Sequence, residues 1–284
     1  MKPAPFAYVR PASRAEAVGL LAEHGDDGKV LAGGQSLVAA MNFRLARPGV
    51  LIDINGVRDL DFLRAEDRWL RIGALTRHAA FHKEVIGGPL GALLGKVVRH
   101  IAHYPIRQRG TFTGSLAHAD PASEWCLVAT TLGAQMHVAG PAGERVCAAG
   151  DFFKGTFTTA LGSRDLLTEV RLPVLGENWR SGFYEFSRRA GDFALAMALA
   201  ALRIEGGLIR EARLGVGGVS DRALRLSSLE AELVGKAPQP QLFADIAEAA
   251  RAQIKPSADI HASPAYRSDL IRTVVKRALA QAAA

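Results

Sequence analysis

The first 55 residues alternate between apolar runs and amphipathic stretches, which predicts strands joined by helices. A capping-box sequence, S-x-x-E, predicts that a helix begins after Ser13. The apolar run 30–32 predicts a buried strand, and a second helix is expected to begin at Ser36 and to end near Pro48. Another apolar strand is expected over 50–54. This segment therefore predicts a small β-α-β-like lobe.

Between residues 56 and 173 the pattern predicts a second lobe that mixes strands with helices. Strands are expected as a hairpin over 60–72, as a second hairpin over 136–147, and over 166–172. Helices are expected over 78–85 with Thr76 as N-cap, over 90–101, and over 121–132. Together with the first lobe, this mixture predicts an α+β fold.

The last part of the chain predicts a smaller domain after a linker over 173–179. The segments 183–186, 194–203 and 208–217 predict a three-stranded antiparallel sheet, with a hairpin turn at Gly206-Gly207. Helices are expected over 226–234, 241–254 and 265–282. The expected organisation is thus two lobes, 1–55 and 56–173, and a C-terminal domain, 174–284.

The composition of the 284 residues is that of an ordinary globular protein, with 49% hydrophobic and 22% charged residues. No apolar run is long enough to span a bilayer, and the N-terminal stretch lacks the apolar region of a signal peptide. A cytoplasmic location is therefore expected. The net charge is +7, but the positive residues are scattered, so nucleic-acid binding is weakly supported. An acidic partner subunit or solubility explains the charge equally well.

The residue types that ligate metals occur without a recognisable pattern. Cys126 and Cys147 form no C-x-x-C pair, so the chain alone cannot supply the four cysteines of an iron–sulfur cluster. Two histidine pairs have helical spacing without a third ligand: His78 with His82, and His100 with His103. These side chains are expected to be solvated or buried in the core, and no metal site is predicted.

A glycine pair after the strand over 30–32 is the first candidate for ligand binding. Gly33-Gly34 followed by Gln35-Ser36 and a helix is a geometry in which backbone N–H groups can approach an anion such as phosphate. The alternative is a simple turn between a strand and a helix. The spacing matches neither the dinucleotide fingerprint G-x-G-x-x-G nor a Walker A loop.

A second loop, R-G-T-F-T-G-S over 109–115, also combines glycines with hydroxyl groups. Asp120 and Glu124 follow it. Two small-residue loops that are far apart in sequence suit a ligand with two phosphates, which they would hold from both sides. The alternative is a polar turn ahead of the helix expected from Pro121.

These residues carry a resemblance to a known family. The segments AGGQSLVAAMNFRLARPGVLIDIN (32–55), RGTFTGSLAHADPASE (109–124) and RRAGDFA (188–194) resemble FAD-binding medium subunits of molybdenum hydroxylases. This is the family of xanthine dehydrogenase, carbon monoxide dehydrogenase and bacterial N-heterocycle hydroxylases, and the quinoline- and nicotine-type members look most similar. The resemblance implies a two-lobed FAD-binding domain of the PCMH (vanillyl-alcohol-oxidase-like) type, followed by a C-terminal domain of the carbon monoxide dehydrogenase flavoprotein type.

The resemblance also implies which residues contact FAD. The first loop would contact the diphosphate and ribityl parts of FAD through Val30, Leu31, Ala32, Gly33, Gly34, Gln35, Ser36 and Leu37. The second diphosphate loop would contain Gly110, Thr111, Thr113, Gly114 and Ser115. Relatives commonly have T-I-G-G-N/S there, so Thr113 replaces a glycine. Its hydroxyl could substitute for a lost N–H contact, or FAD binding could be weaker.

The other implied contacts each have a structural alternative. The family comparison favours Glu124 for the adenosine ribose, whereas Asp120 could contact the ligand or cap a helix. Leu166 and Leu167 match a position near the edge of the isoalloxazine ring and could also be buried strand residues. Phe193 matches an aromatic near the ring, although core packing is the more usual role of a single Phe. Xanthine dehydrogenase-like members carry a lysine near Tyr184, which is absent here.

The resemblance implies a division of labour among three subunits. A large subunit would oxidise substrate at a molybdenum cofactor, and a small subunit would relay electrons through two [2Fe–2S] clusters. This chain would pass the electrons from FAD to an external acceptor, within a heterotrimer that pairs into a dimer of heterotrimers. An N-heteroaromatic substrate is expected first, and carbon monoxide or an aldehyde second. Two alternatives stay open: a stand-alone flavin oxidoreductase, and a non-catalytic homologue that has lost FAD.

Overall fold

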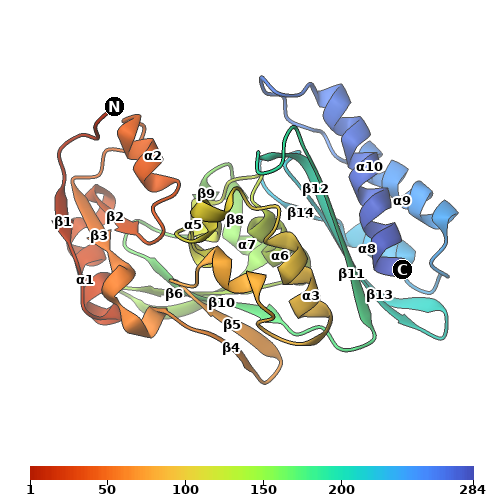
Figure 1. Ribbon diagram of the computed structural model, residues 1–284, viewed down its shortest axis with the longest axis horizontal. Coiled ribbons are helices and arrows are strands. Elements are labelled where there is room, and N and C mark those ends of the chain that lie inside the picture. Colours follow the sequence, from red (N-terminus) through yellow and green to blue (C-terminus); the bar gives the residue numbers. More distant parts are fainter.

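The structure is a computed structural model that describes residues 1–284, and its elements form three parts arranged in a row (Figure 1). The N-terminal lobe lies at one end, the second lobe in the middle, and the C-terminal domain at the other end. Each part contains its own β-sheet. The structure thus has the α+β architecture that the sequence predicts.

The N-terminal lobe is built on a three-stranded parallel sheet with the order β1-β3-β2. Its strands are β1 (Ala7–Val9), β2 (Gly28–Leu31) and β3 (Val50–Asp53), and its helices are α1 (Arg14–His24) and α2 (Leu37–Asn42). Ser13 caps α1 as predicted, because its hydroxyl accepts a hydrogen bond from the Glu16 N–H at 3.2 Å. The expected end of the second helix near Pro48 is wrong. The chain leaves the helix after Asn42, and Arg44 has a φ of 58° that no helix can accommodate.

The second lobe is built on a five-stranded antiparallel sheet with the order β4-β5-β10-β6-β7. Its strands are β4 (Leu63–Glu66), β5 (Trp69–Gly73), β6 (Gln135–Gly140), β7 (Gly143–Ala148) and β10 (Leu166–Pro173), and β8 (Phe153–Gly155) pairs separately with β9 (Thr158–Thr159). Its α-helices are α3 (Gly88–Val97), α4 (Tyr104–Arg107), α5 (Phe112–His118), α6 (Glu124–Leu132) and α7 (Ala149–Phe152). Both predicted hairpins and the predicted strand over 166–172 are present.

One helix prediction in this lobe is wrong, and another has the wrong start. The helix expected over 78–85 is only a 3₁₀ turn, His78–His82, and Thr76 donates its hydroxyl to the Phe62 carbonyl at 2.7 Å instead of capping it. The helix expected over 121–132 begins at Glu124, and a separate helix, α5, precedes it. The break between the two lies at Ala119, whose φ is 54°.

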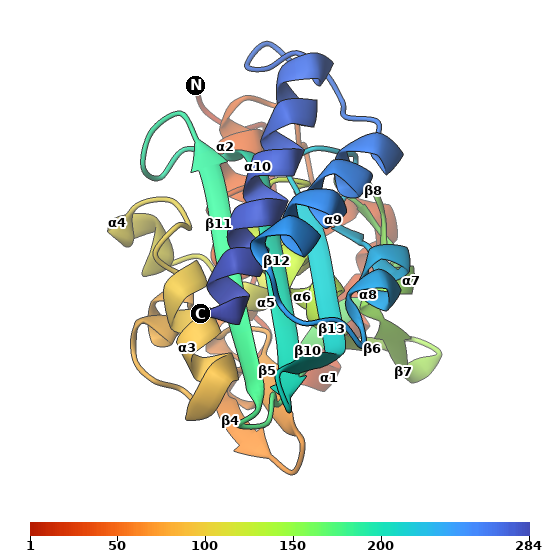
Figure 2. The ribbon, with the colours of Figure 1, turned by 90° about the vertical axis from the view of Figure 1, so that its right-hand side faces the viewer.

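The C-terminal domain is built on an antiparallel sheet with the order β11-β12-β13-β14, covered on one face by helices (Figure 2). Its elements are β11 (Trp179–Ser187), β12 (Ala194–Glu205), β13 (Leu208–Gly217), β14 (Leu224–Arg225), α8 (Ser227–Leu233), α9 (Pro240–Gln253) and α10 (Pro264–Ala283). The three long strands match the prediction, and Gly206 and Gly207 both have the positive φ of the predicted hairpin turn. The short strand β14 is an addition that the sequence pattern did not indicate.

Strand β12 joins the C-terminal domain to the second lobe because both of its faces are buried. Met197 and Leu199 point into the core of the second lobe, whereas Ala198 and Ala200 point into a core formed with α8, α9 and α10. This burial on both sides explains the unbroken apolar sequence of the strand. The sheet is therefore held between α3 and α6 on one side and the C-terminal helices on the other (Figure 1).

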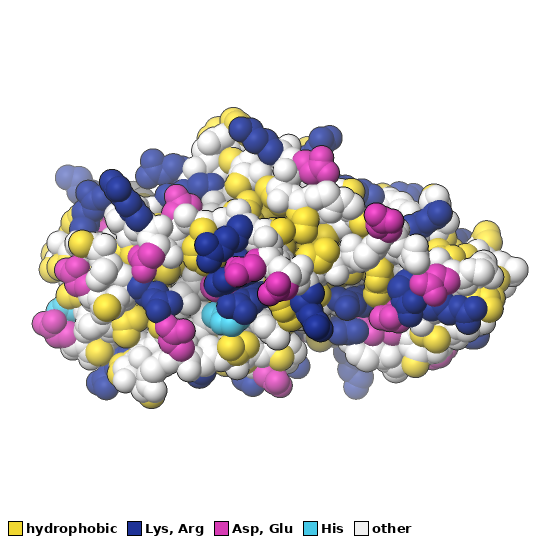
Figure 3. All heavy atoms as spheres, turned by 90° about the horizontal axis from the view of Figure 1, so that it is seen from below, with side chains coloured by type: hydrophobic (Ala, Val, Ile, Leu, Met, Phe, Trp, Pro, Cys, Tyr) yellow, Lys and Arg dark blue, Asp and Glu magenta, His cyan; other side chains and the backbone are white.

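Charged side chains are dispersed over the surface that Figure 3 shows. On this face Lys and Arg are interspersed with Asp and Glu, and they form no continuous basic stripe. None of the helices combines the length and the apolar character that crossing a bilayer requires.

Candidate functional site

The two glycine loops, 30–37 and 109–115, meet in the structure although they are far apart in sequence. A Cβ atom on Gly33 would lie 2.6 Å from the Arg109 carbonyl oxygen and 2.7 Å from the Gly110 Cα. Real Cβ atoms essentially never come so close to a backbone atom. Only glycine can therefore occupy position 33 while the loops remain in contact.

The first loop leaves its backbone donors free. Each backbone N–H from Gly33 to Leu37 lacks a hydrogen-bond acceptor within the chain. Gly34 has a φ of 73°, which turns the backbone between β2 and α2, and the side-chain amide of Gln35 holds this turn by donating to the Gly33 carbonyl at 3.1 Å. Ser36 does not cap α2 with its side chain. Because unpaired N–H groups are costly unless water or a ligand accepts from them, the loop has the donors that a phosphate requires.

A chain of side-chain hydrogen bonds ties the two loops together. Asn55 donates to the Ala32 carbonyl at 2.9 Å and accepts from the Arg77 guanidinium at 2.5 Å. Arg77 also donates to the Arg109 carbonyl. Burial, and then the neighbouring Arg109, lower the pKa of Arg77. Two arginines, Arg77 and Arg109, thus bring positive charge to the region where the loops meet, an arrangement that suits a diphosphate.

His78 packs against Gly110 of the second loop. A Cβ atom on Gly110 would lie 2.6 Å from His78 Nε2, so glycine is required here as well. The His78 backbone N–H donates to the Gly110 carbonyl at 3.0 Å, and its ring Nδ1 accepts from the Trp125 indole at 3.0 Å. Burial, with Arg107 and Arg77, lowers the pKa of His78 to about 4. The ring is therefore neutral at pH 7 and acts as a core residue, one of the two roles expected from the sequence.

Thr111 and Thr113 have opposite orientations in the second loop. Thr111 is the N-cap of α5 and accepts from the Gly114 N–H at 3.0 Å. Thr113 is 2% exposed, and its hydroxyl donates to the Gly73 carbonyl at 3.2 Å. Its side chain therefore cannot offer a substitute contact to a ligand, which corrects one of the two interpretations of this residue. The Thr113 backbone N–H, in contrast, has no acceptor within the chain.

The Thr111→Val substitution is expected to weaken FAD binding moderately. Valine has the same shape but cannot accept the Gly114 N–H, and loss of an N-cap costs about 1 kcal/mol, or about a fivefold change in affinity. The measurement is a fluorescence titration of FAD into the FAD-depleted complex. Thr273→Val, on α10, is the matched control. An affinity for FAD that is equal in both variants would contradict this role of Thr111.

Asp120 and Glu124 lie on either side of the start of α6. Asp120 does not cap this helix: it accepts from the Ala122 N–H at 2.9 Å, and Ser123 is the N-cap. Glu124 is the first residue of α6 and is 9% exposed. Burial, with a contribution from Asp120, raises the pKa of Glu124 to about 7. Cys126, two residues further, contacts the Ser115 carbonyl with its thiol, so the start of α6 lies beside the second loop.

The remaining predicted contacts fall outside the loops. Leu166 is buried in the core of the N-terminal lobe and Leu167 in the core of the second lobe, so both are strand residues at the junction of the two lobes. Phe193 is 73% exposed in the loop between β11 and β12, and the expectation that it packs in a core is wrong. Gly191 of the same loop lies against the His103 ring.

Sequence reasoning missed Asn55 and Arg77 as parts of the site. The position of Asn55 could have been predicted from the strand order, because β2 and β3 are parallel and pair Leu31 with Asp53. Residues that follow parallel neighbouring strands meet at the same edge of the sheet, which brings Asn55 to Ala32. No feature of the sequence indicates that Arg77 belongs to the site, because its hydrogen bonds depend on how the two lobes pack.

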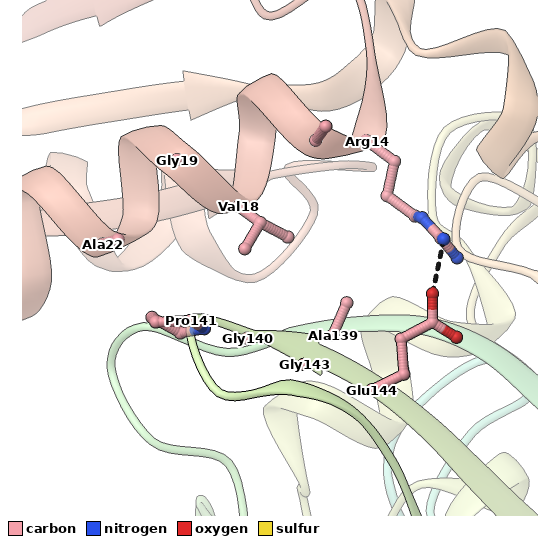
Figure 4. A pocket seen from close by; sticks show the side chains of 10 residues that line it. Arg14, Val18, Gly19, Ala22, Ala139, Gly140, Pro141, Gly143 and Glu144 are labelled. Atoms are coloured by element: carbon pink, nitrogen blue, oxygen red, sulfur yellow. Dashed lines mark hydrogen bonds and ion pairs between the residues drawn. The ribbon is translucent and has the colours of Figure 1, made fainter.

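A separate cleft of about 410 Å³ lies between α1 and the turn from β6 to β7 (Figure 4). Small residues line most of it, and an ion pair between Arg14 and Glu144 at 2.5 Å crosses it. It shares no residue with either glycine loop. Both charges are solvent-accessible, so the pair contributes little to stability, and the cleft offers no donors comparable to those of the first loop.

Comparison with known proteins gives matches along the whole chain. Residues 4–175 match the family described as the FAD binding domain in molybdopterin dehydrogenase, and residues 181–282 match the CO dehydrogenase flavoprotein C-terminal domain. The chain is 37% identical to the caffeine dehydrogenase subunit beta of Pseudomonas sp. (strain CBB1) over 284 residues, which cover 100% of this chain and 96% of that protein.

Two solved structures have the same fold. One is carbon monoxide dehydrogenase from Hydrogenophaga pseudoflava in a form that lacks the Mo-pyranopterin moiety of its cofactor, with a TM-score of 0.95, 34% identity, and coverage of 99% of this chain and 98% of that chain. The other is quinoline 2-oxidoreductase from Pseudomonas putida 86, with a TM-score of 0.93, 37% identity, and coverage of 100% of this chain and 98% of that chain. Identity at this level over whole chains is more than a likeness of fold.

Proposed function

Because this chain belongs to the family of FAD-binding medium subunits of molybdenum hydroxylases, we propose that it accepts electrons from the [2Fe–2S] clusters of a small subunit and delivers them to an external acceptor. The contact of Gly33 with Arg109 and Gly110 carries the proposal, since it brings the free amides of the first loop next to the second loop. When bound, the flavin can exchange electrons singly with iron–sulfur clusters and in pairs with an acceptor.

The residues present fit FAD in the chemistry of their donors. The free amides of the first loop and the Thr113 N–H would hold the diphosphate, with Arg77 and Arg109 supplying positive charge. We retain as the proposed FAD site the residues Val30, Leu31, Ala32, Gly33, Gly34, Gln35, Ser36, Leu37, Gly110, Thr111, Thr113, Gly114, Ser115, Asp120, Glu124, Leu166, Leu167 and Phe193. The proposed domain boundaries are after residues 55 and 173, since no sheet crosses either position.

The substrate would be oxidised in the large subunit, at the molybdenum cofactor, and not on this chain. We propose an N-heteroaromatic compound, which is supported by the similarity to a subunit of caffeine dehydrogenase and to quinoline 2-oxidoreductase. Carbon monoxide or an aldehyde is the second choice, supported by the similarity to carbon monoxide dehydrogenase. The proposed assembly is a cytoplasmic dimer of heterotrimers.

Rapid mixing of N-heteroaromatic substrates with the reconstituted complex tests this function. In the complete complex the absorbance of oxidised flavin is expected to bleach after the iron–sulfur clusters are reduced. In a complex without the small subunit, the same substrates should leave the flavin oxidised. Direct reduction of the flavin in this chain by substrate, without either partner, would instead indicate a stand-alone flavin oxidoreductase. If the purified chain alone is colourless, without the yellow of oxidised flavin, it is a homologue that has lost FAD.

A further inference from the structure

Asp53, the last residue of β3, is a buried carboxylate with hydrogen bonds to both of its oxygens. The residue is 7% exposed. Its Oδ1 accepts from the Asn55 backbone N–H at 2.9 Å and from the Asn55 side-chain amide at 2.5 Å, and its Oδ2 accepts from the Tyr8 hydroxyl. Burial acts to raise the pKa of Asp53, but these hydrogen bonds outweigh it and lower the pKa, so the group is ionised at neutral pH. Asp53 is thus engaged within its own lobe, and its charge would repel a phosphate.

The contacts of Asn55 are compatible with only one orientation of its side-chain amide. Its Nδ2 donates to Asp53 and also to the Ala32 carbonyl at 2.9 Å, while its Oδ1 accepts from Arg77 at 2.5 Å. Turning the amide over would point Oδ1 at two acceptors, and it would point the NH₂ group at a guanidinium that can only donate. Because an ionised carboxylate can only accept, Asp53 selects the orientation that the other two contacts require.

The contact with Ala32 determines the direction of the first free N–H group of the first loop. The chain has no cis peptide bond, and in a trans peptide the C=O and the N–H point in opposite directions. Since Asn55 holds the Ala32 carbonyl on its own side, the Gly33 N–H points away from Asn55. This N–H has no acceptor within the chain. The Asn55 amide therefore aims one of the donors that would hold the diphosphate.

The contact with Arg77 extends the same control to the second lobe. One nitrogen of the Arg77 guanidinium donates to Asn55 Oδ1, and another donates to the Arg109 carbonyl of the second loop. Without Asn55 in this orientation, the Arg109 carbonyl would be the only hydrogen-bond partner left to Arg77. One carboxylate of the N-terminal lobe thus governs the position of groups in both loops.

We propose that Asp53 is a positioning residue for FAD, which acts by orienting the Asn55 side chain and does not touch the ligand itself. The inference rests on the proposed function, because FAD is the ligand that the Gly33 N–H and Arg77 would bind. A purely structural role would use a different contact. Asp53 also caps the 3₁₀ turn Ile54–Gly56, through the hydrogen bond from the Asn55 backbone N–H. The two roles therefore depend on different donors of Asn55.

Two substitutions at position 53 separate the positioning role from the cap. Asp53→Ser keeps a capping hydroxyl, but serine is one atom shorter and cannot reach the Asn55 side-chain amide. Asp53→Asn keeps an acceptor oxygen for both contacts, and its NH₂ group can donate to the Tyr8 hydroxyl. In fluorescence titrations of the FAD-depleted complex, Asp53→Ser is expected to weaken FAD binding about tenfold, the effect of losing one hydrogen bond to a charged group. Asp53→Asn should stay within about twofold of the wild type.

Tyr8→Phe is the matched control, because it removes the hydrogen bond to Oδ2 and leaves both contacts of Oδ1 in place. It should bind FAD as the wild type does. A double variant identifies the route of the effect. Asp53→Ser combined with Asn55→Ala should bind FAD no more weakly than Asn55→Ala alone, because Asp53 acts through Asn55.

The inference is overturned if Asp53→Ser binds FAD as tightly as the wild type, if Asp53→Asn loses as much affinity as Asp53→Ser, or if the effects in the double variant are additive. Failure of Asp53→Ser to assemble with its partner subunits would likewise assign Asp53 to the fold and not to FAD. A wild-type complex that does not bind FAD would contradict the proposed function itself. The two failures can therefore be told apart.

Discussion

The Gly33→Val substitution is expected to lower the affinity of the complex for FAD about a hundredfold. A side chain at position 33 would meet the Arg109 carbonyl oxygen at 2.6 Å, so the loops must separate. Overpacking of this kind costs about 3 kcal/mol at its upper end, which corresponds to about two orders of magnitude in affinity. The measurement is the FAD content of the purified complex, followed by titration with FAD.

Gly19→Val is the matched control for this substitution. Gly19 lies on α1, and a Cβ atom there would have no neighbour within 4 Å. The control should therefore retain the FAD content of the wild type, and both variants should unfold cooperatively. Full FAD occupancy in Gly33→Val would show that the two loops need not touch for FAD to bind.

The Arg77→Met substitution is expected to weaken FAD binding about thirtyfold. Methionine keeps part of the apolar stem of arginine, but it loses the hydrogen bonds to Asn55 and to the Arg109 carbonyl. Hydrogen bonds that involve a charged group contribute about 2 kcal/mol, and the variant also removes a positive charge from the diphosphate region. The affinity of the variant should accordingly depend less on salt concentration than that of the wild type.

Two further variants define what the Arg77 result means. Arg68→Met, in the exposed turn between β4 and β5, removes a cation without disturbing the loops and should bind FAD normally. Asn55→Ala combined with Arg77→Met should weaken binding by less than the sum of the single effects, because both residues belong to one chain of hydrogen bonds. Strict additivity would show that Arg77 acts only through its charge.

The apolar pattern of the sequence predicted most of the longer strands, chiefly those that bury side chains, such as β3, β10 and β12. For β12 the apolar sequence is continuous, and the structure shows both faces buried. The strand β14 comprises only Leu224 and Arg225, too few residues for any periodicity. Local apolar pattern therefore identifies a strand only where the strand is long enough to repeat it.

Helix boundaries were harder to predict because their signals were absent or misleading. The break between α5 and α6 occurs at Ala119, a residue with φ of 54° where glycine or asparagine would have been the usual marker. The end of α2 at Asn42 likewise precedes any glycine or proline. At Ala119 a tertiary contact, the hydrogen bond from the Phe157 N–H to the Ala119 carbonyl, holds a conformation that the local sequence does not indicate.

The candidate site was predictable where it depends on backbone and not where it depends on packing between lobes. Gly33, Gly34 and Gly110 stood out because glycine permits close approach, and the structure places them against each other or against neighbouring groups. The inward orientation of Thr113 and the exposure of Phe193 depend on the second lobe and on the loop between β11 and β12. These three-dimensional relations have no counterpart in the spacing of residues along the chain.

The central claim is that both glycine loops close on one diphosphate, and a structure of the FAD-loaded complex tests it most directly. The account predicts that the phosphate oxygens of FAD lie about 3 Å from the amide nitrogens of the first loop and of Thr113. Phosphates bound at any other surface of this chain, with these amides still lacking an acceptor, would contradict the account.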